Sequence, residues 1–191
     1  MDEKLLHSLK DKARKILENN TRFHCYAHAI EVLENVIKLV GVFGEEKYDK
    51  TALFAAALFH DASNHQEKEL EGVEGSEIAG KVLMETDGFP EEKINDVKRL
   101  IKSINEDREK TNDEIILNTA DEMAAFSELG LIRSFMISGN KGMKVREAIE
   151  WELAYLEKRY NKLKLQVAKD LVADFYENRK NLLLTSLKKL Q

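Results

Sequence analysis

Four side chains of the sequence could together bind a metal ion. His60 and Asp61 are adjacent and follow the apolar run 51–59, while His28 and Asp121 lie within two other helical segments. Imidazole nitrogens and carboxylate oxygens are good ligands of divalent metals, and helices can hold them rigidly around one point. Such a site leaves coordination positions for water and a substrate oxygen, and an ion bound there would make the water more acidic.

The adjacent pair His60–Asp61 constrains where the site can lie. Neighbouring residues on an α-helix point about 100° apart, so both side chains can reach one ion only near a helix end. The polar residues that follow the pair fit such an end. Taken alone, His60 could equally be a core histidine and Asp61 a surface acid. The presence of His28 and Asp121 favours the metal site.

Other residues near these four could take part in chemistry. His24 precedes His28 by about one helical turn, a spacing at which two imidazoles can share an ion or an anion. The polar stretch after the pair could supply a general base or a phosphate-binding cation, although a solvated charged loop would look the same. Its candidate residues are His65, Glu67, Lys68 and Glu69. Cys25 could pair with His28 as a nucleophile, but no third group orients the pair, so we interpret Cys25 as a buried thiol.

The order of the four residues resembles the H…HD…D signature of the HD-domain superfamily of metal-dependent phosphohydrolases. Segment 24–33 (HCYAHAIEVL) is similar to the HDxxHxxRV motif of one subgroup, and 58–61 (LFHD) is similar to its LLHD motif. Segment 118–123 (NTADEM) resembles the DADRL-type motif. The resemblance implies an HD-like helical bundle in which His28, His60, Asp61 and Asp121 bind a divalent ion.

The expected activity is hydrolysis of a small phosphorylated metabolite, with a nucleotide as the favoured class, through metal-activated water. The expected catalytic residues are Asp61, His65, Lys68 and Glu69. Substrate contacts are expected from Lys68 and, by the resemblance, from His24. Because the ligand set is mixed, the ion could be Mn, Fe, Ni, Co, Zn or Mg.

An alternative of another class stays open. The chain could be a catalytically inactive HD module that serves as a binding or dimerisation protein. Two departures favour this alternative: Glu31 stands where the subgroup has arginine, and Ile104 or Asn105 stands where it often has another histidine.

The composition is that of a soluble globular protein. The chain has 191 residues, 43% of them hydrophobic, and a net charge of −5 with its cations scattered among acids. The broad basic surface of a nucleic-acid-binding protein is missing, so we expect no stable nucleic-acid binding. The single Cys25 excludes an internal disulfide, the apolar runs are too short to cross a bilayer, and no secretory signal is visible. We therefore expect a cytoplasmic protein without membrane contact.

The periodicity of the apolar residues predicts an all-α fold. Three- and four-residue spacings indicate helices over 5–17, 23–42, about 49–61, 76–86 and 112–129, with another beginning at Pro90. Asp49 is a predicted N-cap, and Thr111 with Glu114 forms a predicted capping box. Residues 62–74 are expected to form a polar loop. Gly130 is expected to end the helix that carries Asp121.

The C-terminal segment contains no glycine or proline from Met143 onwards. Its apolar residues repeat at steps of three and four from Ile149 to Val167. One straight helix to Leu187 would be roughly 65 Å long at ~1.5 Å per residue, so the segment must fold back or pack on a partner. We predict a catalytic domain at 1–140 and a long C-terminal helical extension at 141–191. A homodimer is the assembly that we favour.

Overall fold

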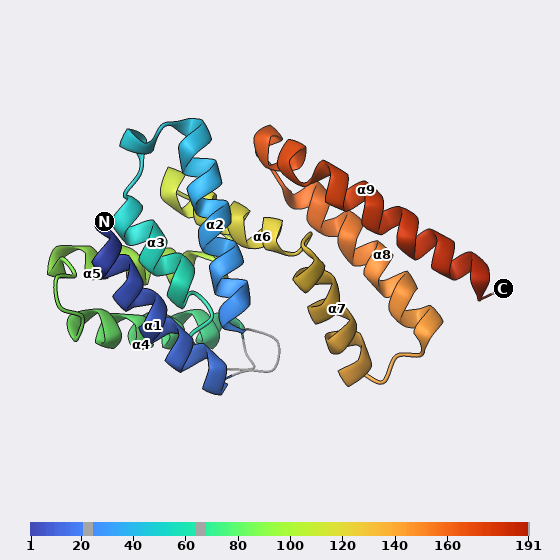
Figure 1. Cartoon of the computed structure of the whole chain (residues 1–191), viewed down its shortest axis with the longest axis horizontal. Helices are drawn as coiled ribbons and strands as arrows, with labels where there is room; N and C mark the ends of the chain where they lie inside the picture. Colours follow the sequence, from blue (N-terminus) through green and yellow to red (C-terminus); the bar gives the residue numbers. More distant parts are fainter. Residues whose placement is uncertain (21–24, 64–67, 191) are drawn as a thin grey trace. The chain divides into compact units, whose positions relative to one another are not determined.

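The computed structural model describes residues 1–20, 25–63 and 68–190, and these residues form helices joined by turns (Figure 1). No strand occurs in these ranges, which confirms the predicted all-α fold. The α-helices are α1 (Glu3–Asn20), α2 (Tyr26–Phe43), α3 (Lys50–Phe59), α4 (Lys68–Met84), α5 (Ile94–Ser103), α6 (Asn112–Ala124), α7 (Glu128–Asn140), α8 (Val145–Lys162) and α9 (Gln166–Lys189). No helix in the described part of the chain is long and apolar enough to cross a membrane.

The chain divides into two compact units, Met1–Ala120 and Asp121–Gln191. The first unit contains α1 to α5 and most of α6. The second contains the last turn of α6 and helices α7 to α9. This boundary lies inside helix α6 and separates two compact groups of residues, so it does not test a division by function. The predicted division into a catalytic domain at 1–140 and a C-terminal extension at 141–191 stays a prediction.

Helix α3 forms the centre of the first unit. Its residues Ala52, Leu53 and 55–59 are all buried, and the helix packs against α1, α2, α4 and α5. The alanines among these residues have small side chains, which let neighbouring helices approach closely, and each buried leucine contributes roughly 1.5–3 kcal/mol. The side chain of Asp49 accepts a hydrogen bond from the Ala52 amide at 3.1 Å, which confirms the predicted N-cap. This buried helix ends at Phe59, directly before His60 and Asp61.

Helix α4 begins earlier than the sequence indicated. We expected a loop over 62–74, but α4 starts at Lys68. The polar character of this stretch suggested a loop, whereas Lys68, Glu69, Leu70 and Glu71, which precede Gly72, are residues that favour a helix. A Cβ at Gly75 would lie 3.6 Å from the carbonyl oxygen of His60, so this glycine faces the end of α3.

The transition into α5 also differs from the prediction. Pro90 does not start an α-helix but precedes a short 3₁₀ turn, Glu91–Lys93, after which α5 begins.

Helix α6 has the predicted start and a different end. The Thr111 amide donates to Glu114 Oε2 at 2.8 Å, and the Glu114 amide donates to Thr111 Oγ1 at 3.5 Å, so the capping box is confirmed. The helix ends at Ala124, and Gly130 lies inside α7 rather than ending α6. A Cβ at residue 130 would lie 2.5 Å from the Ala125 carbonyl oxygen, so the glycine serves a close backbone approach.

The C-terminal segment forms a helical hairpin. Helix α8 ends at Lys162, α9 starts at Gln166, and the two helices pack against each other (Figure 1). Both helices carry buried apolar residues, among them Leu156, Val172 and Leu183. The hairpin excludes the single long helix and, of the two predicted alternatives, supports the one in which the segment folds back. The homodimer stays a prediction.

Candidate metal centre

His60 is held in one orientation by the end of α3. It lies directly after the last residue of that helix, with helical backbone angles, and its side chain is almost fully buried. The distance between Nδ1 and the Ala57 carbonyl oxygen is 2.8 Å. A carbonyl can only accept, so Nδ1 carries the hydrogen, and Nε2 of the neutral ring presents its lone pair.

His28 and Asp61 lie close to this nitrogen. The Nε2 atoms of His28 and His60 are 3.3 Å apart, and the two rings meet edge to face. Asp61 Oδ2 lies 3.4 Å from Nε2 of His28 and 3.2 Å from Nε2 of His60. His28 comes from the first turn of α2, so a residue far away in sequence has joined the adjacent pair.

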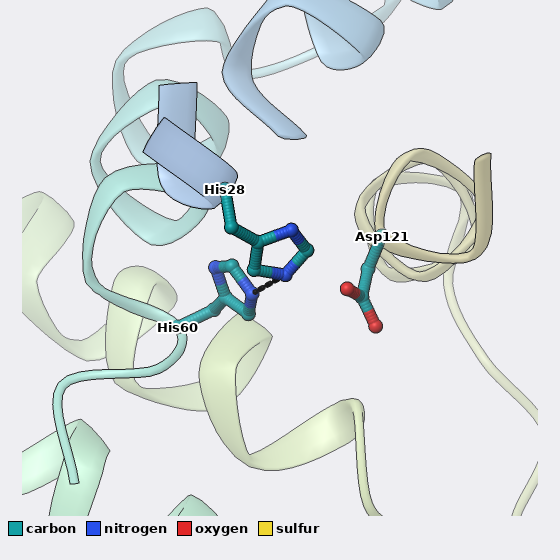
Figure 2. A group of neighbouring side chains, drawn as sticks. All are labelled: His28, His60 and Asp121. Atoms are coloured by element: carbon teal, nitrogen blue, oxygen red, sulfur yellow. Dashed lines mark hydrogen bonds between the residues drawn. The ribbon is translucent and has the colours of Figure 1, made fainter. Parts of the chain in front are cut away.

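Asp121 extends from α6 toward the two imidazole rings (Figure 2). One ligand atom each from His28, His60 and Asp121 lie within 4.8 Å of one another. Asp121 follows Ala120, the last residue of the first unit, on the same helix. The side-chain amide of Asn35 on α2 donates to the Ala120 carbonyl at 3.1 Å, so α6 is fixed to the helix that carries His28.

The arrangement of these donors fits a divalent cation. Two ligands at ~2.1 Å from an ion and at right angles to each other are about 3 Å apart. The measured separations of 3.2–3.4 Å among His28, His60 and Asp61 are close to this value. Two carboxylates and imidazole lone pairs that converge in a largely buried place repel one another unless a cation joins them. The four predicted ligands are therefore near one another, and their coordination of an ion is a proposal.

The other predicted site residues are not placed by the structure. His24, His65 and Glu67 lie outside the described residues. Lys68 and Glu69 begin α4, but their side chains are likewise outside the described part. Their expected roles in catalysis and in substrate binding remain predictions.

Cys25 differs from its prediction as a buried thiol. It is half-buried and occupies the N-cap position of α2, where its carbonyl accepts from the His28 amide at 3.0 Å. As the N-cap, Cys25 has an extended backbone and precedes α2, so it does not lie on the apolar face of that helix as predicted.

Two residues of the site region carried no recognisable sequence signal. Asn35 stands seven residues after His28, hence on the same face of α2, but an asparagine at such a position is usually a surface residue. Ser63 follows the His60–Asp61 pair and donates from its hydroxyl to Glu74 on α4. This hydrogen bond joins the turn after α3 to α4. Both contacts depend on how the helices pack, which spacing does not reveal.

Comparison with solved structures identifies the fold. The chain resembles the Lin1889 protein from Listeria innocua, with a TM-score of 0.74 and 22% identity over 100% of this chain and 98% of that one. An HD-superfamily hydrolase from Bacillus thuringiensis has a TM-score of 0.74 and 19% identity, over 98% and 97% of the two chains. This chain has the HD-superfamily fold. The fold implied by the sequence motifs is thus confirmed.

A third similar structure is Bacillus subtilis YpgQ in complex with ADP. Its TM-score is 0.68 at 18% identity, over 98% of this chain and 93% of that one. These matches span α7 to α9, so the C-terminal helices belong to the shared fold. No family model matches the sequence, and no curated protein matches it.

Proposed function

We propose that this protein is a metal-dependent phosphohydrolase of the HD superfamily. The observation that carries the proposal is the convergence of His28, His60, Asp61 and Asp121 at a largely buried point. The fold supports it, because one similar structure is an HD-superfamily hydrolase. The residues also follow the order H…HD…D along the chain.

Each residue has a role that follows from its surroundings. His28 and His60 would hold the ion through Nε2, and the Ala57 carbonyl keeps His60 in the tautomer that can do so. A bound divalent ion supplies a Lewis acid and acidifies a coordinated water. The side chain of Asp61 is 14% exposed, more than either imidazole, and a carboxylate can accept a proton from water, so we assign this role to Asp61.

The substrate class that we propose is a small phosphorylated metabolite, with a nucleotide favoured. ADP in the similar structure of YpgQ supports the nucleotide class. Glu31 lies one turn after His28 on α2 and places a carboxylate where the related motif has arginine. A negative charge there repels phosphate, so the cations for the substrate must come from elsewhere, and Lys68 and His24 are our candidates.

A second candidate function rests on the same glutamate. If Glu31 prevents phosphate binding at the ion, the chain is a binding module that keeps the fold and the metal. Metal binding alone does not separate the two functions, whereas turnover does.

The metal site is tested by titration of the chelator-treated full chain with Mn²⁺, with elemental analysis of the loaded protein. We expect one ion per chain in the wild type and none in His60→Ala or Asp61→Ala. The matched control is His7→Ala, because His7 is an exposed histidine on α1. Unchanged stoichiometry in both site variants would contradict the assignment.

A further inference from the structure

A cavity of about 290 Å³ lies over the polar face of α5. It belongs to the unit Met1–Ala120 and includes none of the candidate metal ligands. Its lining residues are Asn95, Lys98, Arg99, Lys102, Glu106 and Arg108. Helix α5 buries Val97, Leu100 and Ile101 on its other face, so its polar residues are left to line the cavity.

Two arginines of the cavity share one buried carboxylate. Nη1 of Arg99 and Nη2 of Arg108 each donate to Glu114 Oε1 at 2.9 Å, and Nη1 of Arg108 donates to Glu114 Oε2 at 3.1 Å. The Glu114 side chain is fully buried, whereas the two arginine side chains are 40% and 42% exposed. Glu114 therefore fixes both guanidinium groups in place, and little conformational entropy remains to be lost when a ligand binds.

Two lysines share a second carboxylate. The Nζ atoms of Lys98 and Lys102 lie 2.8 Å and 4.0 Å from Glu77 on α4. The stem of Lys98 passes over Gly80, where a Cβ would lie 3.1 Å from Lys98 Cδ. Packing against α4 thus directs this ammonium group. The four cations around the cavity therefore form two pairs, and each pair shares one carboxylate: Glu114 for the arginines and Glu77 for the lysines.

Two further acids moderate this charge. Asp96 lies 3.5 Å from Arg99, and Glu106 lies 2.8 Å from Arg108. Both carboxylates are nearly half exposed, so solvent screens them and their ion pairs are weak. Glu106 is the one carboxylate among the lining residues. Its negative charge would repel an anion in the cavity, so removal of this charge should strengthen anion binding.

We propose that this cavity binds a small anion that carries phosphate groups, at a second site distinct from the metal centre. Arg99 and Arg108 already donate to Glu114, and Arg108 donates also to Glu106 and to the Glu109 carbonyl, so they would attract phosphate through their positive charge and their remaining N–H groups. Lys98 and Lys102 add two further charges from the same helix as Arg99. The volume of about 290 Å³ is just below the ~300–1,000 Å³ typical of ligand pockets, which suits phosphate groups rather than a whole nucleotide. This site goes beyond the proposed hydrolysis and does not depend on it.

The test is calorimetric titration of the full chain with inorganic pyrophosphate in the presence of chelator. We expect one binding site in the wild type and in His60→Ala. Lys98→Gln should weaken the binding about five-fold, and Glu106→Gln should strengthen it by a similar factor, as expected for single charges beside a phosphate. The control Lys38→Gln removes an exposed cation of α2 and should change nothing.

Lys98 pairs with Glu77 and not with Glu114, so Lys98→Gln leaves the hydrogen bonds of Glu114 at the start of α6 intact. Arg108→Gln should also weaken binding, and its folding is checked by circular dichroism. A parallel titration with ADP separates the two sources of phosphate groups: tighter pyrophosphate binding points to a free anion, and tighter ADP binding points to a phosphate ester. Binding that is lost in His60→Ala and unchanged in Lys98→Gln would place the anion at the metal centre and overturn the proposal.

Discussion

Glu114 anchors the start of the helix that carries Asp121, and its removal should destabilise the fold measurably. The hydrogen bond from Arg108, with further ones from the Thr111 amide and Arg99, lowers the pKa of Glu114 from 4.5 to about 2, although burial opposes this. At ~1.36 kcal/mol for each pKa unit, the difference of 4.5 − 2 = 2.5 corresponds to about 3 kcal/mol of stability. Because both arginines are partly exposed and solvent screens them, we expect Glu114→Gln to cost about 2 kcal/mol at pH 7.

Urea unfolding followed by circular dichroism measures this loss. The folded pKa of Glu114 lies below the unfolded one, so its contribution is complete above about pH 4.5 and disappears as the pH falls towards 2. The gap in unfolding free energy between wild type and Glu114→Gln should therefore shrink below pH 4.5. Glu109→Gln, which removes an exposed carboxylate from the preceding loop, is the control and should stay within ~0.5 kcal/mol of wild type. A loss of unfolding free energy for Glu114→Gln as small as that for Glu109→Gln, or one that does not change with pH, would refute the reasoning.

Three further predictions concern other parts of the molecule. Asn35→Ala removes the hydrogen bond to the Ala120 carbonyl and should weaken Mn²⁺ binding about ten-fold in a titration, as does the loss of other residues that hold metal ligands in place. Unchanged affinity would mean that Asn35 does not position Asp121. Arg179→Met breaks a buried ion pair with Glu152 (3.2 Å) and should lower the free energy of unfolding by about 3–5 kcal/mol, measured by thermal unfolding. The double variant that also carries Glu152→Leu should regain much of this stability. Equal losses in the single and double variants would refute the role of the ion pair. Light scattering should give a dimer for the wild type and a monomer for Phe175→Glu, which charges an exposed apolar residue of α9, and a monomeric wild type would end the dimer hypothesis.

Local signals in the sequence predicted much of the fold. Asp49 and the Thr111–Glu114 pair cap their helices as expected, because an N-cap depends on residues within one turn. The prediction that Gly130 ends α6 was wrong, because α6 ends at Ala124 and Gly130 lies inside α7, where its missing side chain admits the Ala125 carbonyl. The break at Leu163–Leu165 contains no glycine or proline, so no local sequence signal marks it, although α8 and α9 pack against each other on either side of it.

The candidate site was predictable in its residue types and not in its geometry. His28, His60, Asp61 and Asp121 were identified from ligand chemistry and from their order along the chain. Their proximity is a tertiary fact: α2, the end of α3 and α6 must meet for the Nε2 and carboxylate atoms to approach. The contribution of Asn35 follows from the same packing, so no spacing along the sequence could have revealed it.

The most direct test of the central claim is phosphate or pyrophosphate release from nucleoside mono-, di- and triphosphates by the metal-loaded full chain. The proposed function predicts turnover with Mn, Co, Ni or Mg that chelation abolishes. It also predicts that His60→Ala and Asp61→Ala are inactive while the control His7→Ala remains active. Absence of turnover on every substrate, with one ion shown to be bound per chain, would contradict the claim and favour the non-catalytic binding module.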